Sequence, residues 1–317
     1  MRTFGRSRAV GCAPWIALAC IAVLAKAPCA HAAISVTDDA GERVTLAAPA
    51  QRVVALAPHA VELAYAAGGG AKLVGAVSYS DYPSAAKALP RVGTNTALDL
   101  ERIVALKPDL VIVWRHGNGE RQLDRLRALG IPLYHSEPRK LDAVAADLIA
   151  LGTLMGTAGQ AQAAAADYRA KIAALRARYA GRSPVSVFYE VWADPLMTLS
   201  GAHIVSDVIA LCGGRNVFAH LAPLVPTVST EAVVAADPEA IVTASQGATR
   251  ADAPLPSLAA WQAWPRMTAV ARSNLFAIDG DLITRPGPRL AQGAEQLCRD
   301  LDLARERRPS ASAARKR

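Results

Sequence analysis

The chain has 317 residues, and 52% of them are hydrophobic, so it is long enough and apolar enough to bury the cores of two compact domains. Its formal net charge of +8 is concentrated in residues 1–32 and 304–317, and the stretch between them is close to neutral. A near-neutral body excludes the broad basic surface by which proteins bind nucleic acids.

The first 32 residues have the three parts of a secretory signal peptide. A basic start precedes the apolar run WIALACIAVLA, which is too short for a membrane-spanning helix. The small-x-small pattern AHA then ends at Ala32, so we expect the mature chain to begin near Ala33. The alternatives are an uncleaved anchor and a lipoprotein attached at Cys20. We therefore expect a soluble protein that works outside the cytoplasm.

Residues 33–156 alternate between strand and helix patterns and form the first predicted lobe. Strands are expected in residues 52–58, 72–79, 109–114 and 131–136, and helices in residues 59–70, 97–108 and 120–130. The apolar run DLVIVW is typical of a parallel strand that is covered on both faces. This β-α-β-α order predicts a mostly parallel sheet flanked by helices.

The pattern changes in residues 157–180, whose alanine-rich and charged sequence predicts one long helix. The alternation then resumes over residues 181–303, which form the second predicted lobe. The basic residues 304–317 are expected to be a disordered tail without a role of their own. The fold class is therefore α/β, with two Rossmann-like lobes of mostly parallel sheet joined by a single long rigid helix.

One stretch of the first lobe recurs in the second. LDLERIVALKPDLVIVW, residues 98–114, aligns without a gap with VSTEAVVAADPEAIVTA, residues 228–244. The alignment places Glu101 on Glu231 and matches the proline-acid pair before each strand. We interpret the repeat as one strand-and-helix unit in each lobe. The alternative is chance similarity between two amphipathic helices.

The candidate ligand-binding residues follow the predicted strands, because ligands of open parallel sheets bind at the carboxyl ends of the strands. Aromatic residues make up only 5% of the chain, yet Tyr79, Trp114 and Trp192 lie at such ends, and Asp281 and Arg285 follow the last strand. A cleft between two lobes with these side chains suits a large flat ligand with polar edges. The alternative for each aromatic residue is a place in the core or at its rim.

Motifs of common enzyme classes are absent: there is no Walker loop, no G-x-S-x-G, no H-E-x-x-H and no G-x-G-x-x-G after a strand. We therefore expect no catalytic residue. The histidines after the signal segment have no local metal-site spacing, although several could meet in a cleft as a zinc-type site. These histidines are His59, His116, His135, His203 and His220. A haem iron ligated by Tyr79 is another alternative.

Two cysteines, Cys212 and Cys298, remain once the signal segment is removed. In an oxidising compartment such a pair predicts one structural disulfide, and the alternative is two buried free thiols. Each cysteine ends an apolar helical pattern, so the expected bond would link two helices of the second lobe.

Four segments together resemble the periplasmic solute-binding proteins of cobalamin and iron-siderophore ABC importers, most of all the cobalamin branch. They are VTDDAGERVTLAAPAQRVVALAPHAVELAYAAG, VGAVSYSDYP, LDLERIVALKPDLVIVWRHGN and GPRLAQGAEQLC. The resemblance extends over about residues 33–303. It implies the class III periplasmic binding protein fold with limited lobe closure. It also implies a periplasmic location and a monomer.

The resemblance further implies a ligand, a partner and site residues. The ligand is cobalamin or a related corrinoid, carried as cargo and not as a cofactor, and the partner is an inner-membrane ABC permease dimer. Tyr79 and Trp114 would contact the corrin, together with the second-lobe loop Asp281, Leu282, Ile283, Thr284 and Arg285. Glu101 and Glu231 would dock the transporter. Cys212 and Cys298 match the disulfide pair of the family.

The chain departs from the family pattern at several aromatic positions. Asn95 and Val225 stand where the family can show tryptophan, and Leu282 and Ile283 stand where aromatic residues are expected. Trp192 is the candidate that compensates for these losses. The alternatives to a corrinoid carrier are a haem or ferric-siderophore binding protein of the same fold and, in a different class, a secreted two-lobe enzyme or chelatase.

Overall fold

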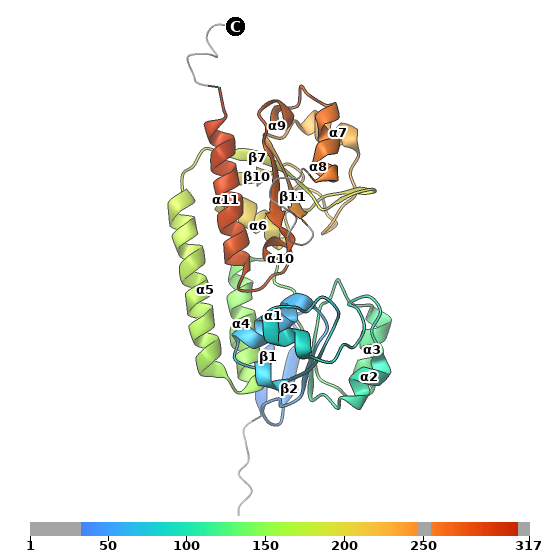
Figure 1. Cartoon of the computed structure of the whole chain (residues 1–317). Coiled ribbons are helices and arrows are strands. Elements are labelled where there is room, and N and C mark those ends of the chain that lie inside the picture. Colours follow the sequence, from blue (N-terminus) through green and yellow to red (C-terminus); the bar gives the residue numbers. More distant parts are fainter. Residues whose placement is uncertain (1–32, 246–254, 310–317) are drawn as a thin grey trace, which may run out of the picture. The chain divides into compact units, whose positions relative to one another are not determined.

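The structure, a computed structural model, describes residues 33–245 and 255–309 (Figure 1). The predicted signal peptide and residues 310–317 of the predicted tail lie outside these ranges. Among the helices of the two described ranges, none has both the length and the hydropathy needed to cross a membrane.

The first lobe is built on a four-stranded parallel sheet. Its strands lie in the order β4-β3-β5-β6, with the bounds β3 Val53–Ala55, β4 Leu73–Ala76, β5 Leu110–Val113 and β6 Leu133–His135. Its helical elements are α1 Pro58–Ala66, η1 Gly70–Lys72, η2 Ser84–Ala88, α2 Leu100–Ala105 and α3 Glu120–Ala128. β5 is buried along its whole length, as its apolar sequence predicts. An antiparallel hairpin that the pattern did not predict, β1 Ile34–Thr37 and β2 Arg43–Leu46, precedes the sheet.

The second lobe is built on a second four-stranded parallel sheet. Its strands lie in the order β10-β7-β11-β12, with the bounds β7 Val185–Glu190, β10 Gly214–Asn216, β11 Ala240–Ser245 and β12 Leu275–Asp279. A small antiparallel hairpin, β8 Trp192–Ala193 and β9 Leu196–Met197, follows β7. Its helical elements are α6 Ile204–Leu211, α7 Thr230–Ala236, α8 Pro256–Ala260, η3 Trp261–Ala263, α9 Thr268–Ala271, α10 Gly280–Ile283 and α11 Leu290–Glu306.

Both parallel sheets have the same strand order. If the four strands of each sheet are numbered 1 to 4 along the chain, their spatial order across the sheet is 2-1-3-4 in both lobes. All neighbouring strands in the two sheets are parallel. The predicted α/β fold with two Rossmann-like lobes is therefore confirmed. Each sheet also has a switch point between its first and third strands, which is where open α/β sheets bind ligands.

Two packed helices connect the sheets: α4 Leu141–Met155 and α5 Ala158–Tyr179 (Figure 1). α4 ends at Gly156, whose φ of 69° is left-handed, so α5 starts as a separate helix close to the predicted range 157–180. The buried residues of α5 recur at alternating spacings of four and three, which makes one apolar stripe. They are Ala161, Ala165, Tyr168, Ile172, Leu175 and Tyr179. α5 packs against α4 and α11 with this long helix face.

The predicted repeat is confirmed as one βα unit in each lobe. α2 and β5 match α7 and β11, and β5 and β11 are the third strands of their sheets. Both helices have a side-chain N-cap, since Asp99 accepts from the Arg102 amide at 2.9 Å and Ser229 accepts from the Ala232 amide at 3.2 Å. The backbone repeats as well: Lys107 and Asp237, the aligned residues before each proline, have φ of 47° and 39°.

The end of the second lobe is more ordered than the sequence predicts. α11 continues to Glu306, and Arg305 donates from Nε to the Ser183 carbonyl at 2.9 Å and from Nη2 to the Cys212 carbonyl at 2.7 Å. Arg308 pairs with Glu239 at 2.8 Å. The boundary predicted at residue 304 is therefore wrong, because these arginines are structural ties of the lobe and not part of a free basic tail.

The predicted disulfide is present between Cys212 and Cys298, whose Cα atoms are 4.7 Å apart. It links the C-cap of α6 to the middle of α11, and both cysteines are fully buried. The bond closes a loop with a sequence separation of 86 residues. In the chain-entropy model such a loop contributes about 4.6 kcal/mol of stability.

Candidate functional site

Tyr79 follows the carboxyl end of β4 and is the most exposed large apolar side chain among the described residues, at 77%. Its φ is 64°, a left-handed conformation that is uncommon for a residue other than glycine. Strained backbone of this kind gathers at ligand sites, where the surrounding structure maintains it. Tyr79 therefore presents its ring and hydroxyl to solvent where the sheet is expected to meet a ligand.

Trp114 follows β5 and is half-buried, because two neighbours fix its ring. His59 packs edge-on against it, with ring centroids 5.7 Å apart. On another side the ring lies on Gly117, where a Cβ atom would come within 1.8 Å of the ring carbon Cε3. Burial lowers the pKa of His59 to about 4, so this imidazole is neutral at physiological pH and is a packing partner.

Asn118 fixes the turn that follows Trp114. Its buried side chain accepts from the Trp114 amide at 2.7 Å and donates to the carbonyls of Leu56 at 2.9 Å and Asn95 at 2.8 Å. It thereby joins the segments that follow β3 and β5 to the loop at Asn95. Asn95 occupies a position where the family can show tryptophan. Here its side-chain amide stabilises the loop, because Nδ2 donates to the Gly117 carbonyl at 3.3 Å.

Trp192 lies in the β8-β9 hairpin, directly after β7, and is 53% exposed. Its Nε1 donates to the Asp194 carbonyl at 2.7 Å, which orients the indole while its apolar surface stays accessible. Val225, the other expected tryptophan position, is half-buried and packs against the core. The three predicted aromatic residues thus follow β4, β5 and β7, and all three keep accessible ring surface.

A cluster of five charged residues connects the two lobes, and we call it the interlobe cluster. It consists of Glu62, Asp81, Asp281, Arg285 and Arg289. Arg285 contacts three carboxylates, those of Glu62 at 3.1 Å, Asp81 at 2.7 Å and Asp281 at 2.7 Å. The Arg289 guanidinium binds Glu62 twice, from Nε at 2.9 Å and from Nη2 at 2.6 Å, and lies 3.9 Å from the centre of the Tyr82 ring.

Three members of the interlobe cluster, Asp81, Arg285 and Arg289, are held in their charged forms by their partners. Burial alone would lower the pKa of Arg285, but hydrogen bonds to Asp81 and Glu62 outweigh it and raise that pKa. Burial alone would raise the pKa of Asp81, but the hydrogen bond from Arg285 holds it below its usual value. The predicted contact of Arg285 with a ligand edge stays a prediction, and in the structure its side chain is 12% exposed and is engaged by protein carboxylates.

Sequence reasoning missed Glu62, which is the centre of the cluster. The side chain of Glu62 is only 2% exposed, and it lies on α1 among buried apolar neighbours. An acidic residue on the apolar face of a helix is a detectable sign, because a buried carboxylate requires a cationic partner. The partners could not be found in the same way, since Arg285 and Arg289 are more than 220 residues away in the chain.

The segment Asp281–Arg285 is not the open loop that was predicted. Residues 280–283 form the short helix α10, where Asp279 accepts from the Asp281 amide at 2.9 Å. Ile283 ends this helix fully buried in the core, so its proposed contact with a ligand is wrong. Leu282 is half-buried and Thr284 is exposed, so both keep some surface.

Glu101 and Glu231 occupy matching exposed positions in the first turns of α2 and α7. Hydrogen bonds from its own backbone and from Ser229 lower the pKa of Glu231, which is therefore ionised at neutral pH. The start of α2 lies near the carboxyl edge of the sheet. The Asp99 amide donates to the Val92 carbonyl, and the Val92 amide in turn donates to the carbonyl of Ala76 at the end of β4. The start of α7 is tied to β9, since the Val228 amide donates to Leu196.

The predicted alternative of a histidine-rich metal site gains no support from the described residues. In that part of the chain, one group of His, Cys and carboxylate side chains has ligand atoms close enough to share an ion: Asp38, Glu42 and His135. Both ring nitrogens of His135 already have partners, since Nδ1 is 2.6 Å from Asp38 and Nε2 is 3.1 Å from Arg127 Nη2. These contacts hold the β1-β2 hairpin against the end of β6.

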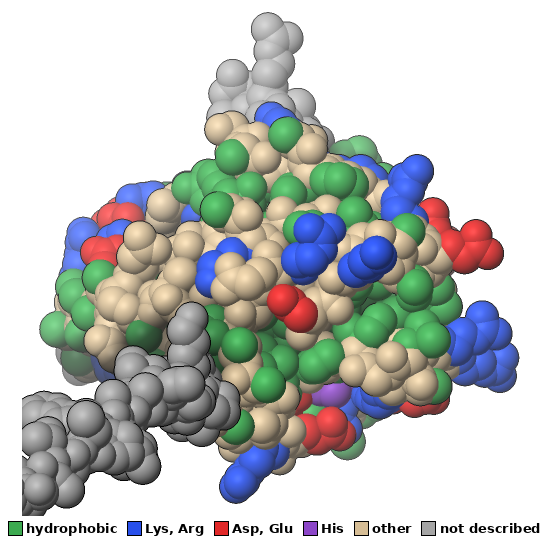
Figure 2. Space-filling model, turned by 90° about the horizontal axis from the view of Figure 1, so that it is seen from below, with side chains coloured by type: hydrophobic (Ala, Val, Ile, Leu, Met, Phe, Trp, Pro, Cys, Tyr) green, Lys and Arg blue, Asp and Glu red, His purple; other side chains and the backbone are tan. Residues whose placement is uncertain are grey.

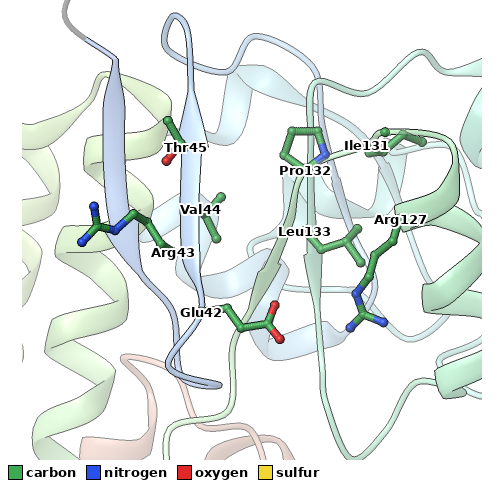
Figure 3. A pocket seen from close by; sticks show the side chains of 9 residues that line it. Glu42, Arg43, Val44, Thr45, Arg127, Ile131, Pro132 and Leu133 are labelled. Carbon is green, nitrogen blue, oxygen red and sulfur yellow. The ribbon is translucent and has the colours of Figure 1, made fainter.

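A cavity of about 440 Å³ lies beside this hairpin, between β2 and the turn that precedes β6 (Figure 3). It is at the amino end of β6 and therefore not at the carboxyl ends of the strands, where the aromatic residues lie. The face displayed in Figure 2 has basic and acidic side chains interspersed with hydrophobic ones.

Known proteins resemble this chain in sequence and structure. The family described as periplasmic binding protein matches residues 53–282. The vitamin B12-binding protein of Yersinia pestis (strain Pestoides F) is 40% identical over 252 residues, or 80% of this chain and 86% of that protein. The crystal structure of the periplasmic vitamin B12 binding protein BtuF of Vibrio cholerae is 39% identical, with a TM-score of 0.74, and the match covers 81% of this chain and 98% of that chain.

A haem-binding protein shares the fold at lower identity. The periplasmic heme-binding protein RhuT from Roseiflexus sp. RS-1, in its apo form, is 27% identical with a TM-score of 0.70, and the match covers 80% of this chain and 99% of that chain. With a family match over residues 53–282 and relatives near 40% identity, the chain belongs to the periplasmic binding protein family.

Proposed function

We propose that the mature chain binds cobalamin or a related corrinoid in the periplasm and delivers it to an ABC importer of the inner membrane. The observation that carries this proposal is the accessible aromatic surface of Tyr79, Trp114 and Trp192 after parallel strands of both lobes. The relatives at 39–40% identity, which are named for vitamin B12, select the corrinoid among large flat ligands.

In this proposal the aromatic side chains contribute apolar area and the rim contributes polar contacts. A buried aromatic side chain covers roughly 150–250 Å² and contributes strongly to binding. Tyr79, Trp114 and Trp192 are assigned to the faces of the corrin, and Asp281, Leu282 and Thr284 to its edge. Cobalamin is cargo here, so the protein requires no resident cofactor.

The direct test is titration of the purified mature protein with cyanocobalamin, followed by tryptophan fluorescence or calorimetry. We expect saturable binding with one corrinoid per chain. No binding in the micromolar range would refute the proposal. The absorption spectrum of the corrinoid released by denaturation should be unchanged, because the proposed role is transport without catalysis, and size-exclusion chromatography should show a monomer.

Haem is the second candidate ligand, and one observation favours it. The phenol of Tyr79 is exposed, and a tyrosine can ligate haem iron. If haem binds, its Soret band should shift on addition of the protein, and Tyr79→Phe should abolish the shift. A corrinoid titration and a haem titration on the same preparation decide between the two ligands.

A further inference from the structure

The solvent-facing part of the interlobe cluster is made of carboxylates. The side chains of Asp81 and Asp281 are 46% and 43% exposed, whereas those of Arg285 and Arg289 are 12% and 15% exposed. The cations therefore lie beneath the anions. A ligand that approaches this surface meets carboxylate oxygens before it meets a guanidinium.

The free hydrogen-bonding sites at the exposed surface of the cluster are also mainly acceptors. Nη1 of Arg285 donates to Glu62 and Asp81, and its Nη2 faces Asp281. Arg289 directs Nε and Nη2 to Glu62. A carboxylate accepts at about four lone-pair sites, so Asp81 and Asp281 retain free acceptor sites at the solvent-facing surface, whereas the donors of Arg285 and Arg289 lie on groups that are only 12% and 15% exposed.

Arg285 is also held against rotation toward a ligand. It shares the carboxylate of Glu62 with Arg289, and Glu62 is only 2% exposed. Turning Arg285 outward would break its contacts with three carboxylates, those of Glu62, Asp81 and Asp281. The anionic surface is therefore a fixed property of the site.

The two exposed carboxylates come from opposite lobes and meet on one guanidinium. Asp81 lies two residues after Tyr79, in the segment that follows β4, and Asp281 lies in α10 directly after β12. Both therefore follow carboxyl ends of parallel strands, where a ligand against Tyr79 would place its edge.

We propose that Asp81 and Asp281 form an acceptor edge that selects corrinoids with neutral amide side chains over tetrapyrroles with carboxylate side chains. Peripheral amides of a corrinoid donate N–H groups to these carboxylates. Peripheral carboxylates, including the propionates of haem, offer no donor and place like charges together, which disfavours the wrong partner. This inference rests on the proposed function and names the chemical class that the site accepts.

The experiment compares two probes that share the corrin ring: dicyanocobinamide, whose periphery carries amides, and dicyanocobyrinic acid, whose periphery carries carboxylates. We expect the wild-type protein to bind the amide form about 10-fold or more tightly than the acid form at low salt. In about 1 M salt, where the Debye length falls to about 3 Å, the ratio should shrink. The double variant Asp81→Asn with Asp281→Asn should reduce the ratio of the two affinities at low salt, because it removes both exposed carboxylates.

The matched control is Asp167→Asn, an exposed acid on α5 that pairs with Lys171, and it should leave the ratio unchanged. A ratio that neither salt nor the double asparagine variant alters would overturn the inference while the proposed function stands. The salt series on the wild-type protein gives this answer even if the double variant does not fold. Failure of the wild-type protein to bind either corrinoid would instead overturn the proposed function, and the inference with it.

Discussion

At the scale of single residues, the candidate site depends on groups that support others. Glu62 is buried and holds two guanidiniums, and Gly117 leaves room for the Trp114 ring. Neither residue is expected to touch a ligand itself. Their effects should therefore appear in stability and in the placement of neighbours.

Glu62→Ala removes the carboxylate that Arg285 and Arg289 share. Because it leaves two largely buried cations short of a partner, we expect it to lower the free energy of unfolding by about 3–5 kcal/mol. Urea denaturation followed by circular dichroism measures this. The control is Glu295→Ala, which breaks the exposed pair with Arg299 and should change stability by less than about 1 kcal/mol. Equal effects of the two variants would show that the cluster does not stabilise the lobes.

Gly117→Ala tests the support of Trp114. A Cβ atom at this position would meet the indole at 1.8 Å, so the ring must move and we expect a loss of about 1–3 kcal/mol in stability together with weaker corrinoid binding. Gly119→Ala is the matched control, because its nearest contact is an ordinary one at 3.4 Å to the Gln122 side chain. Thermal unfolding and a cyanocobalamin titration separate the two effects. Unchanged binding in Gly117→Ala would argue against Trp114 as a ligand contact.

At the scale of elements, the contact between α4 and α5 requires a glycine at one place. A Cβ atom on Gly152 would lie 2.1 Å from the Cβ atom of Ala161, so the two helices approach with almost no side chain between them. The alternating spacing of buried residues on α5 agrees with this close packing. The prediction of a helix at residues 157–180 followed from the same periodicity.

Gly152→Ala should force α4 and α5 apart and lower the free energy of unfolding by about 1–3 kcal/mol. Gly159→Ala, in α5, meets nothing within 4 Å and should be neutral or stabilise the protein by up to about 1 kcal/mol, since alanine favours a helix. Denaturant unfolding of both variants measures the difference. A Gly152→Ala protein as stable as the wild type would show that the helices adjust without cost.

Strand and helix patterns were predictable because each depends on residues close in the chain. The parallel strands, α5 and the βα repeat follow from apolar runs, alanine-rich periodicity and the proline-acid pairs at Pro108 and Pro238. The interlobe cluster was not predictable in this way, because Glu62 finds Arg289 across 227 residues and no local pattern encodes that meeting. The short helix α10 was also missed, since its four residues have too little periodicity to be recognised.

At the scale of the whole molecule, the described residues place one exposed glutamate at the start of a matching helix in each lobe. We infer that Glu101 and Glu231 contact a two-fold symmetric permease through rim charges, which affect encounter and register more than ligand affinity. Glu101→Ala with Glu231→Ala should therefore keep cobalamin affinity within about 2-fold and reduce corrinoid uptake by cells that depend on this carrier. Asp167→Asn serves as the control for an exposed acid elsewhere. Loss of cobalamin affinity in the double variant would refute this division of roles.

The disulfide has a practical consequence for preparing the protein. Cys212 and Cys298 are the two cysteines beyond the predicted signal peptide, so a correctly oxidised mature sample contains no reactive thiol. Recombinant material made in a reducing cytosol would retain both thiols, because disulfides form in oxidising compartments. Thiol titration under denaturing conditions should therefore precede any stability or affinity measurement, since a mixture of oxidised and reduced chains would unfold in two overlapping transitions.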